Sequence, residues 1–218
     1  MDPWTLLQLA DSALPTGGFA HSAGLEAALQ LGRVREPGEV LAFAEAALWA
    51  AGAFAVPFIR ATHADPGLLA AVDARCDAAT PGHVANRASR AQGQAFLRAA
   101  TALYPSAARL AEDVRQARAP GHLAPVFGAV LGLLGAEDDE AARLFLFHTA
   151  RGIFAAALRL GAVGPLEAQA LLARAAPVVA EVLARSRCSD PREAATTSPL
   201  LDLLQAHQDR LYSRLFQS

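Results

Sequence analysis

The stretch that decides the fold is "AEDDEAARLFLFHTARGIFAAALRLG", residues 136–161. Acidic residues stand at its start and Gly161 stands at its end, which is the polarity that an α-helix dipole and a helix stop favour. Apolar residues recur at helical spacing on one face and also occupy the other faces (Leu144, Phe147, Phe154 and Leu158; then Phe145, Leu146 and Ile153). A helix that is apolar nearly all round is typical of the interior of a helical bundle.

The rest of the chain has the composition of helices and contains the start and stop signals that bound them. Hydrophobic residues make up 53% of its 218 residues, and many are alanine and leucine, the best apolar helix formers. Helix starts such as Asp65-Pro66 alternate with breakers such as "TPGH" (80–83) and "APGHLAP" (119–125). We expect one all-α domain over residues 1–218, a single-domain bundle of about eight to ten helices, with a mobile linker near 186–198.

The charge pattern excludes several classes of function. The net charge is −2, so no strong field attracts nucleic acid or an anionic membrane. All 19 basic residues are arginine, and a Walker A loop or a Schiff-base enzyme needs a lysine amine. The N-terminus lacks the features of a secretory signal, and the apolar runs are short or interrupted by charges. We expect a cytoplasmic protein with no membrane span, in which Cys76 and Cys188 are unpaired thiols.

A stiff corner is predicted within "DSALPTGGFAHSAGLEAA", residues 11–28. Pro15 and Gly17 suit the second and fourth positions of a type I turn, and Gly18 suits a positive φ or a close backbone approach. A helix is expected to start near Ser22. The sequence therefore predicts an exposed, rigid bend between two apolar segments.

Three interpretations of this corner remain open. It holds the residue types of a catalytic triad (Asp11, Ser12, His21 and Ser22), but adjacent side chains on a helix diverge. A metal site is the second interpretation, although the six histidines show no close pairing. The third, which we favour, is a surface that a partner protein recognises.

A stripe of polar residues is predicted on the helix that contains "NRASRAQGQAFLR". Arg87, Arg90, Gln94 and Arg98 recur at steps of three, four and four, so they share one helical face. The stripe is either a solvated face or an arginine ladder that pairs with carboxylates of another chain.

The final segment, "SPLLDLLQAHQDRLYSRLFQS", is residues 198–218. Ser198 suits an N-cap, and an apolar stripe with His207 on the same face is expected from Leu200, Leu204, Leu211 and Leu215. Its last residues include Tyr212, Leu215 and Phe216, which are types that anchor interfaces. This end either packs on the chain's own core or becomes ordered on a partner.

These motifs together resemble the urease accessory protein F (UreF) family over nearly the whole chain. The similar stretches are "LLQLADSALPTGGFAHSAGLEAA" (6–28), "SRAQG" (89–93) and the ending with Ser-Arg-Leu-Phe-x-Ser. The chain departs from many bacterial members at Ala20-His21, where Ser-Tyr is common, and at Gln208, where an acid is common.

The resemblance implies an all-α protein with no catalysis of its own, and we separately expect no cofactor and no metal site. Such a protein acts with UreD (also called UreH) and the GTPase UreG to insert nickel into the urease apoprotein. It is implied to be a homodimer that binds UreD/UreH through its terminal segments, recruits UreG and regulates its GTP hydrolysis. A nickel-binding metallochaperone, or an enzyme with its site at Pro15–Ser22, is the alternative.

Partner-binding residues follow from the resemblance at three places. The tail is expected to span residues 207–218. The residues are, in the corner, Pro15, Gly17, Gly18, His21, Ser22, Gly24 and Glu26; in the middle, Arg87, Arg90 and Gln92; and in the tail, Arg210, Tyr212, Arg214, Leu215 and Phe216.

Overall fold

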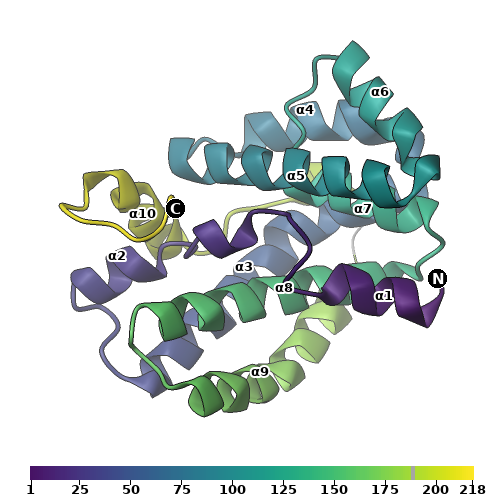
Figure 1. The fold of residues 1–218 in the computed structure, drawn as a ribbon. Coiled ribbons are helices and arrows are strands. Elements are labelled where there is room, and N and C mark those ends of the chain that lie inside the picture. Colours follow the sequence, from purple (N-terminus) through teal and green to yellow (C-terminus); the bar gives the residue numbers. More distant parts are fainter. Residues whose placement is uncertain (188–189) are drawn as a thin grey trace.

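Helix α8 (Asp138–Arg159), the stretch quoted first above, lies among the other helices of a bundle (Figure 1). The computed structural model describes residues 1–187 and 190–218, which form ten α-helices and no β-strand. The predicted all-α bundle is therefore confirmed. The other helices are α1 (Pro3–Ala10), α2 (Leu25–Gln30), α3 (Pro37–Ala64), α4 (Leu69–Ala79), α5 (His83–Leu103), α6 (Ala108–Gln116), α7 (Leu123–Leu133), α9 (Pro165–Arg185) and α10 (Pro199–His207).

The longest helix, α3, joins two hydrophobic clusters. The first cluster contains the N-terminal half of α3 with residues of α2, α8, α9 and α10. The second contains the C-terminal half of α3 with residues of α1, α4, α5, α6 and α7. Both clusters share α8, since Leu144 belongs to the second and Leu146 to the first. Helices α3 and α8 therefore contribute side chains to both clusters.

Helices α3 and α7 approach each other closely because α7 presents glycine to α3. A Cβ atom at Gly128 would lie 2.2 Å from the carbonyl oxygen of Ile59, and one at Gly132 would lie 2.4 Å from that of His63. Neither distance is compatible with a side chain. The hydroxyl of Thr62, which is fully buried, donates to Pro125 O at 2.8 Å across the same contact.

The length and hydropathy of α3 and α8 are also those of membrane-spanning helices. In each helix, half of the most apolar window is buried inside the bundle. Packing of these helices against each other, α7 and α9 accounts for their apolar faces.

Most predicted helix boundaries agree with the structure. The Asp65 side chain accepts the amide of Gly67 and opens a short 3₁₀ turn that continues into α4, which ends at Ala79 before "TPGH". Helix α5 begins at His83, and Gly161 follows α8 with φ = 71°. Cys76 is a free, buried thiol on α4, whereas Cys188 lies outside the described residues.

The predicted final helix is wrong in its second half. Helix α10 ends at His207 and a 3₁₀ turn covers Gln208–Arg210, after which the chain leaves helical geometry. Ser198 precedes the helix but its side chain makes no capping hydrogen bond. The expected stripe does not form, because Leu204 is buried whereas Leu200 and Leu215 are exposed.

The predicted linker, residues 186–198, contains two residues, Cys188 and Ser189, that lie outside the described part of the chain. Hydrogen bonds join the described part to the bundle, and one of them runs from Arg60 Nε to Ser186 O at 3.0 Å. Arg75 Nε donates to Pro191 O at 3.0 Å, and the amide of Ala195 donates to Ala53 O at 3.2 Å.

Candidate functional site

The C-terminal tail meets the start of α2 at the buried carboxylate of Glu26. Glu26 lies in the first turn of α2 and is 2% exposed. Its Oε1 accepts the amide of Leu215 at 2.6 Å, and its Oε2 accepts the amide of Phe216 at 3.0 Å and the side-chain amide of Gln208 at 2.6 Å. Buried carboxylates need such donors. Glu26 therefore fixes the course of the tail over the bundle.

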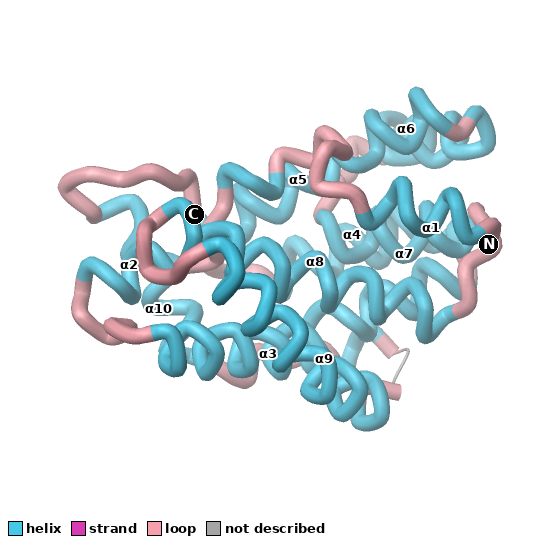
Figure 2. The backbone as a smooth tube through the Cα atoms, turned by 60° about the horizontal axis from the view of Figure 1, so that its bottom comes forward, coloured by secondary structure: helices cyan, strands magenta, loops and turns pink. Residues whose placement is uncertain are grey.

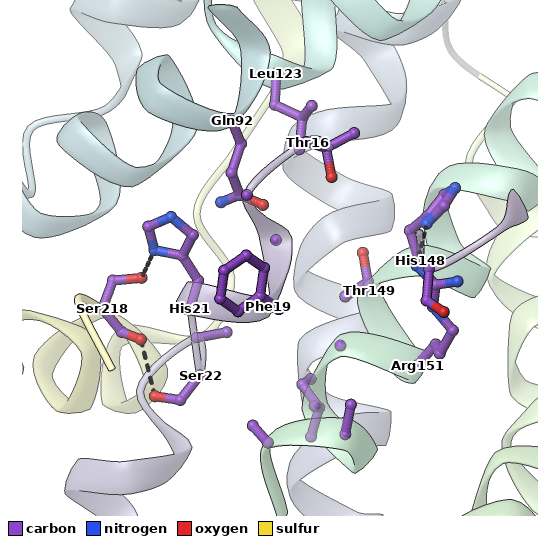
Figure 3. Close-up of a pocket in the computed structure, with 18 of the residues that line it drawn as sticks. Thr16, Phe19, His21, Ser22, Gln92, Leu123, His148, Thr149, Arg151 and Ser218 are labelled. Atoms are coloured by element: carbon purple, nitrogen blue, oxygen red, sulfur yellow. Dashed lines mark hydrogen bonds between the residues drawn. The ribbon is translucent and has the colours of Figure 1, made fainter. Parts of the chain in front are cut away.

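The last two residues also pair with the corner. The amide of Gln217 donates to Ala20 O at 2.8 Å. Both the amide and the hydroxyl of Ser22 donate to Ser218 O, and His21 Nδ1 lies 2.8 Å from Ser218 Oγ (Figure 3). Figures 1 and 2 place the C-terminus beside the segment between α1 and α2. We call residues 15–22 with residues 208–218 the corner–tail surface.

The corner itself differs from the predicted type I turn. The amide of Thr16 donates to Leu14 O at 2.7 Å, which is a γ-turn centred on Pro15. Gly17 has φ = 74°, so the left-handed residue is the first glycine of the pair and not Gly18, which begins a 3₁₀ turn. Helix α2 begins at Leu25 and not near Ser22, although Ser22 Oγ accepts the amide of Glu26.

Gly24 is required where α2 meets α10. It has φ = 87°, a conformation that favours glycine, and a Cβ atom there would lie 2.9 Å from the backbone nitrogen of Gln205. Gly24 therefore allows the two helices to touch through their backbones.

A surface carboxylate, Asp209, holds the outer side of the tail. It accepts hydrogen bonds from His83, Arg87 and Arg214 at 2.8–3.2 Å. The Arg87 hydrogen bond is the largest cause of the lowered pKa of Asp209. Arg87 of the predicted stripe thus joins α5 to the tail, whereas Arg90 is exposed.

The tail residues divide into a buried set and an exposed set. Phe216 is 3% exposed, and the guanidinium of Arg159 lies 4.4 Å from its ring centroid. Tyr212 is fully exposed and Leu215 is half exposed, while Arg210 and Arg214 face solvent. The structure thus presents Tyr212 and Leu215 to the outside and uses Phe216 as the tail's own anchor.

A pocket of about 300 Å³ lies where the corner, α5, α8 and the end of the tail meet. Its polar wall includes His21, Gln92 and Arg159, and its apolar wall includes Phe96 and Ile153. Figure 3 shows His21, Gln92 and Phe19 grouped on one side and His148 and Arg151 on the other. Of the residues predicted for partner binding, Gly17, Gly18, His21, Ser22 and Gln92 line this pocket. The tail contributes Ser218, whereas the predicted tail residues are not part of the lining (Arg210, Tyr212, Arg214, Leu215 and Phe216).

The electrostatics of this pocket are set by α8. Arg151 donates to Ala10 O at 2.6 Å and to Nδ1 of His148 at 3.1 Å, so His148 acts as an acceptor. Burial, with a contribution from the Arg151 charge, lowers the pKa of His148 to about 4. His148 is therefore neutral near pH 7, and Arg151 supplies the positive charge.

The triad residue types of the corner do not converge. The carboxylate of Asp11 accepts the amide of Ala13, and His21 contacts Ser218. Within residues 1–187 and 190–218, no group of three or more His, Cys, Asp or Glu side chains is arranged to hold a metal ion.

The "SRAQG" motif forms an internal joint that sequence reasoning missed. Ser89 Oγ lies 3.0 Å from Nδ1 of the fully buried His122 and accepts the amide of Leu123, while His122 Nε2 lies 3.0 Å from Asp77. The network connects α4, α5 and the start of α7. The helix-breaking segment "APGHLAP" (119–125), which contains His122, is the one sequence feature that marks this position. It does not indicate which helices pack against His122.

Proteins of known family resemble this chain over most of its length. A family model described as UreF matches residues 34–176. The rice (Oryza sativa subsp. indica) protein named urease accessory protein F is 37% identical over 98% of this chain and 84% of its own length. The Arabidopsis thaliana protein of that name is 37% identical over 99% of this chain and 92% of its own length. UreF of Mycobacterium sp. (strain JLS) is 37% identical over 94% of each chain. The chain therefore belongs to the UreF family of urease accessory proteins.

Proposed function

We propose that this chain is a non-catalytic accessory factor in urease maturation. Family membership supports this role, since the relatives are themselves named urease accessory proteins. In this proposal the chain binds UreD/UreH through the corner–tail surface, and the complex recruits UreG and regulates its GTP hydrolysis. The complex then supports nickel insertion into the urease apoprotein, with nickel as cargo.

The observation that carries the proposal is the fixed display of apolar side chains on the corner–tail surface. Phe19 is 77% exposed and Leu215 is 53% exposed, although both belong to segments held by hydrogen bonds. Exposed apolar groups on a rigid surface are typical of protein interfaces. Tyr212 adds a fully exposed aromatic ring that does not pack in the core.

Co-purification with UreD/UreH tests the proposal. Tyr212→Ala should weaken the complex, because Tyr212 is fully exposed and its loss leaves the core intact. Leu166→Ala is the matched control, since Leu166 is 85% exposed on α9, outside the corner–tail surface. Deleting residues 210–218 should abolish the complex while helical circular dichroism remains. Retention of full binding by both the Tyr212 variant and the deletion would refute the proposed surface.

UreG recruitment is assigned to the exposed part of the α5 stripe. Arg90 is exposed, whereas Arg87 is already engaged by Asp209. Arg90→Gln should reduce recruitment of UreG to a preformed complex with UreD/UreH and lower the nickel content of co-expressed urease. Unchanged recruitment would remove Arg90 from the UreG surface.

A second surface favours the proposed homodimer. A groove of about 400 Å³ lies between α8 and α9, and its lining includes Arg143, Phe147, Leu172, Ala173 and Val179. Apolar grooves between surface helices are suited to a second copy. Ala173→Glu should shift sedimentation toward the monomer, whereas Ala170→Glu, on the same helix but outside the groove, should not. A dimer unaffected by Ala173→Glu would place the contact elsewhere.

A further inference from the structure

Gly152 leaves empty space inside the pocket at the corner–tail surface. A Cβ atom there would meet no heavy atom within 4 Å, and Gly152 has no positive φ. Glycine within a helix is destabilising relative to alanine. Neither close packing, as at Gly128, nor backbone conformation explains this glycine of α8. Its effect is to deepen the pocket.

The pocket combines an apolar floor with positive charge. Among the described residues, no Asp or Glu lines the pocket, whereas Arg151 and Arg159 both line it. None of the ion pairs formed within residues 1–187 and 190–218 includes Arg151 or Arg159. The carboxylate that acts on Arg151 is that of Asp11, which is exposed and accepts the amide of Ala13. This wall is complementary to a ligand that carries a carboxylate beside an apolar group.

The pocket opens onto the surface proposed for partner binding. Phe19 and Ser218 line it, and Phe19 is also an exposed apolar residue of the corner. The guanidinium of Arg159 lies 5.9 Å from the Phe19 ring centroid, so pocket and surface share a boundary. An occupant that enters here is continuous with whatever covers the corner–tail surface, which indicates a protein segment.

We propose that this pocket receives an apolar side chain, flanked by a carboxylate, from the protein that docks on the corner–tail surface. The inference rests on the proposed function, in which that protein is UreD/UreH. Gly152 keeps the pocket empty for the incoming side chain, and Arg159 pairs with the carboxylate.

Filling the pocket from within tests this inference. Gly152→Leu places a side chain in the empty space, and a titration with UreD/UreH should show affinity weakened on the order of tenfold or more, because one buried apolar side chain is lost from the interface. Gly38→Leu is the matched control. Gly38 also lies in a helix with no heavy atom near its Cβ position, and it is not among the residues that line the pocket. The Gly38→Leu variant should bind as the unsubstituted chain does.

A second variant tests the charge independently. Arg159→Gln should weaken binding and also reduce its dependence on salt, because an ion pair across the interface is lost. The Arg159 variant therefore tests the inference even if Gly152→Leu destabilises the fold and lowers the melting temperature. Full affinity in the Gly152 variant, or an unchanged salt dependence in the Arg159 variant, overturns the inference. Loss of binding in Tyr212→Ala alone would leave the proposed function standing, whereas no binding by the unsubstituted chain would contradict that function itself.

Discussion

The amide of Leu215 donates a 2.6 Å hydrogen bond to Oε1 of Glu26, across 189 positions of sequence. A single buried carboxylate therefore organises both terminal motifs. The tail's position depends on this anchor more than on its own helical propensity, because helix α10 has ended at His207.

Glu26→Gln should loosen the tail. The substitution replaces one acceptor oxygen with an NH₂ group, which then faces either the amide of Leu215 or the amide donors of Phe216 and Gln208. We expect faster hydrogen exchange at amides 215 and 216 and a loss of about 1–3 kcal/mol in the free energy of unfolding. Glu181→Gln, an exposed position on α9, is the control. Undiminished protection of the two amides would contradict the anchoring role.

Asp209 should make tail docking sensitive to acid. Its pKa is lowered in the folded state, mainly by Arg87, so its contribution to stability is present above its ordinary value of 3.8 and is lost as the pH falls through the lowered value. Chemical shifts of the tail amides should therefore change in that acidic range. In Asp209→Asn this change should be absent, and its persistence would assign the transition to another group.

His148 should make the whole fold less stable between pH 7 and pH 5. Its pKa is about 4 when folded and 6.5 ordinarily, so the unfolded chain binds the extra proton and stability falls as the pH drops from 6.5 toward 4. Urea denaturation should show a loss of about 2 kcal/mol over those two pH units. His148→Gln should flatten the slope, and an equally steep profile in that variant would refute the assignment.

The two left-handed glycines of the corner should differ in their tolerance of alanine. Gly17→Ala meets no neighbour and should cost about 1 kcal/mol, the strain of a positive φ. Gly24→Ala adds a clash with the backbone of Gln205, so its cost should be clearly larger, and α10 should separate from α2. Thermal unfolding of the pair measures the difference. Equal losses would show that backbone contact at Gly24 is unimportant.

Local signals predicted the helices well because those signals are physical caps and breaks. Asp65 and Gly161 act at their own ends of helices, where the sequence alone determines the hydrogen bond or the φ angle. The final helix was overextended because periodic leucines continue past His207, while the competing contact is distant. Glu26 captures amides 215 and 216 in a non-helical course.

The sequence indicated some residues of the candidate site but not their arrangement. Gly17, Gly18, His21, Ser22 and Gln92 line the pocket, whereas the tail contributes Ser218 and none of the tail residues named from the sequence. The convergence of these residues on one pocket depends on how α2, α5, α8 and α10 pack. Gly152 and Asp209 were not singled out, since an open Cβ position and a carboxylate with three donors are properties of the folded chain.

The pairing of Ser22 with Ser218 also sets a time order during protein synthesis. Residue 22 leaves the ribosome early, but its partner is translated 196 positions later. The corner–tail surface is thus completed only after translation reaches residue 218, and a product that terminates before this residue lacks the contacts that define the surface.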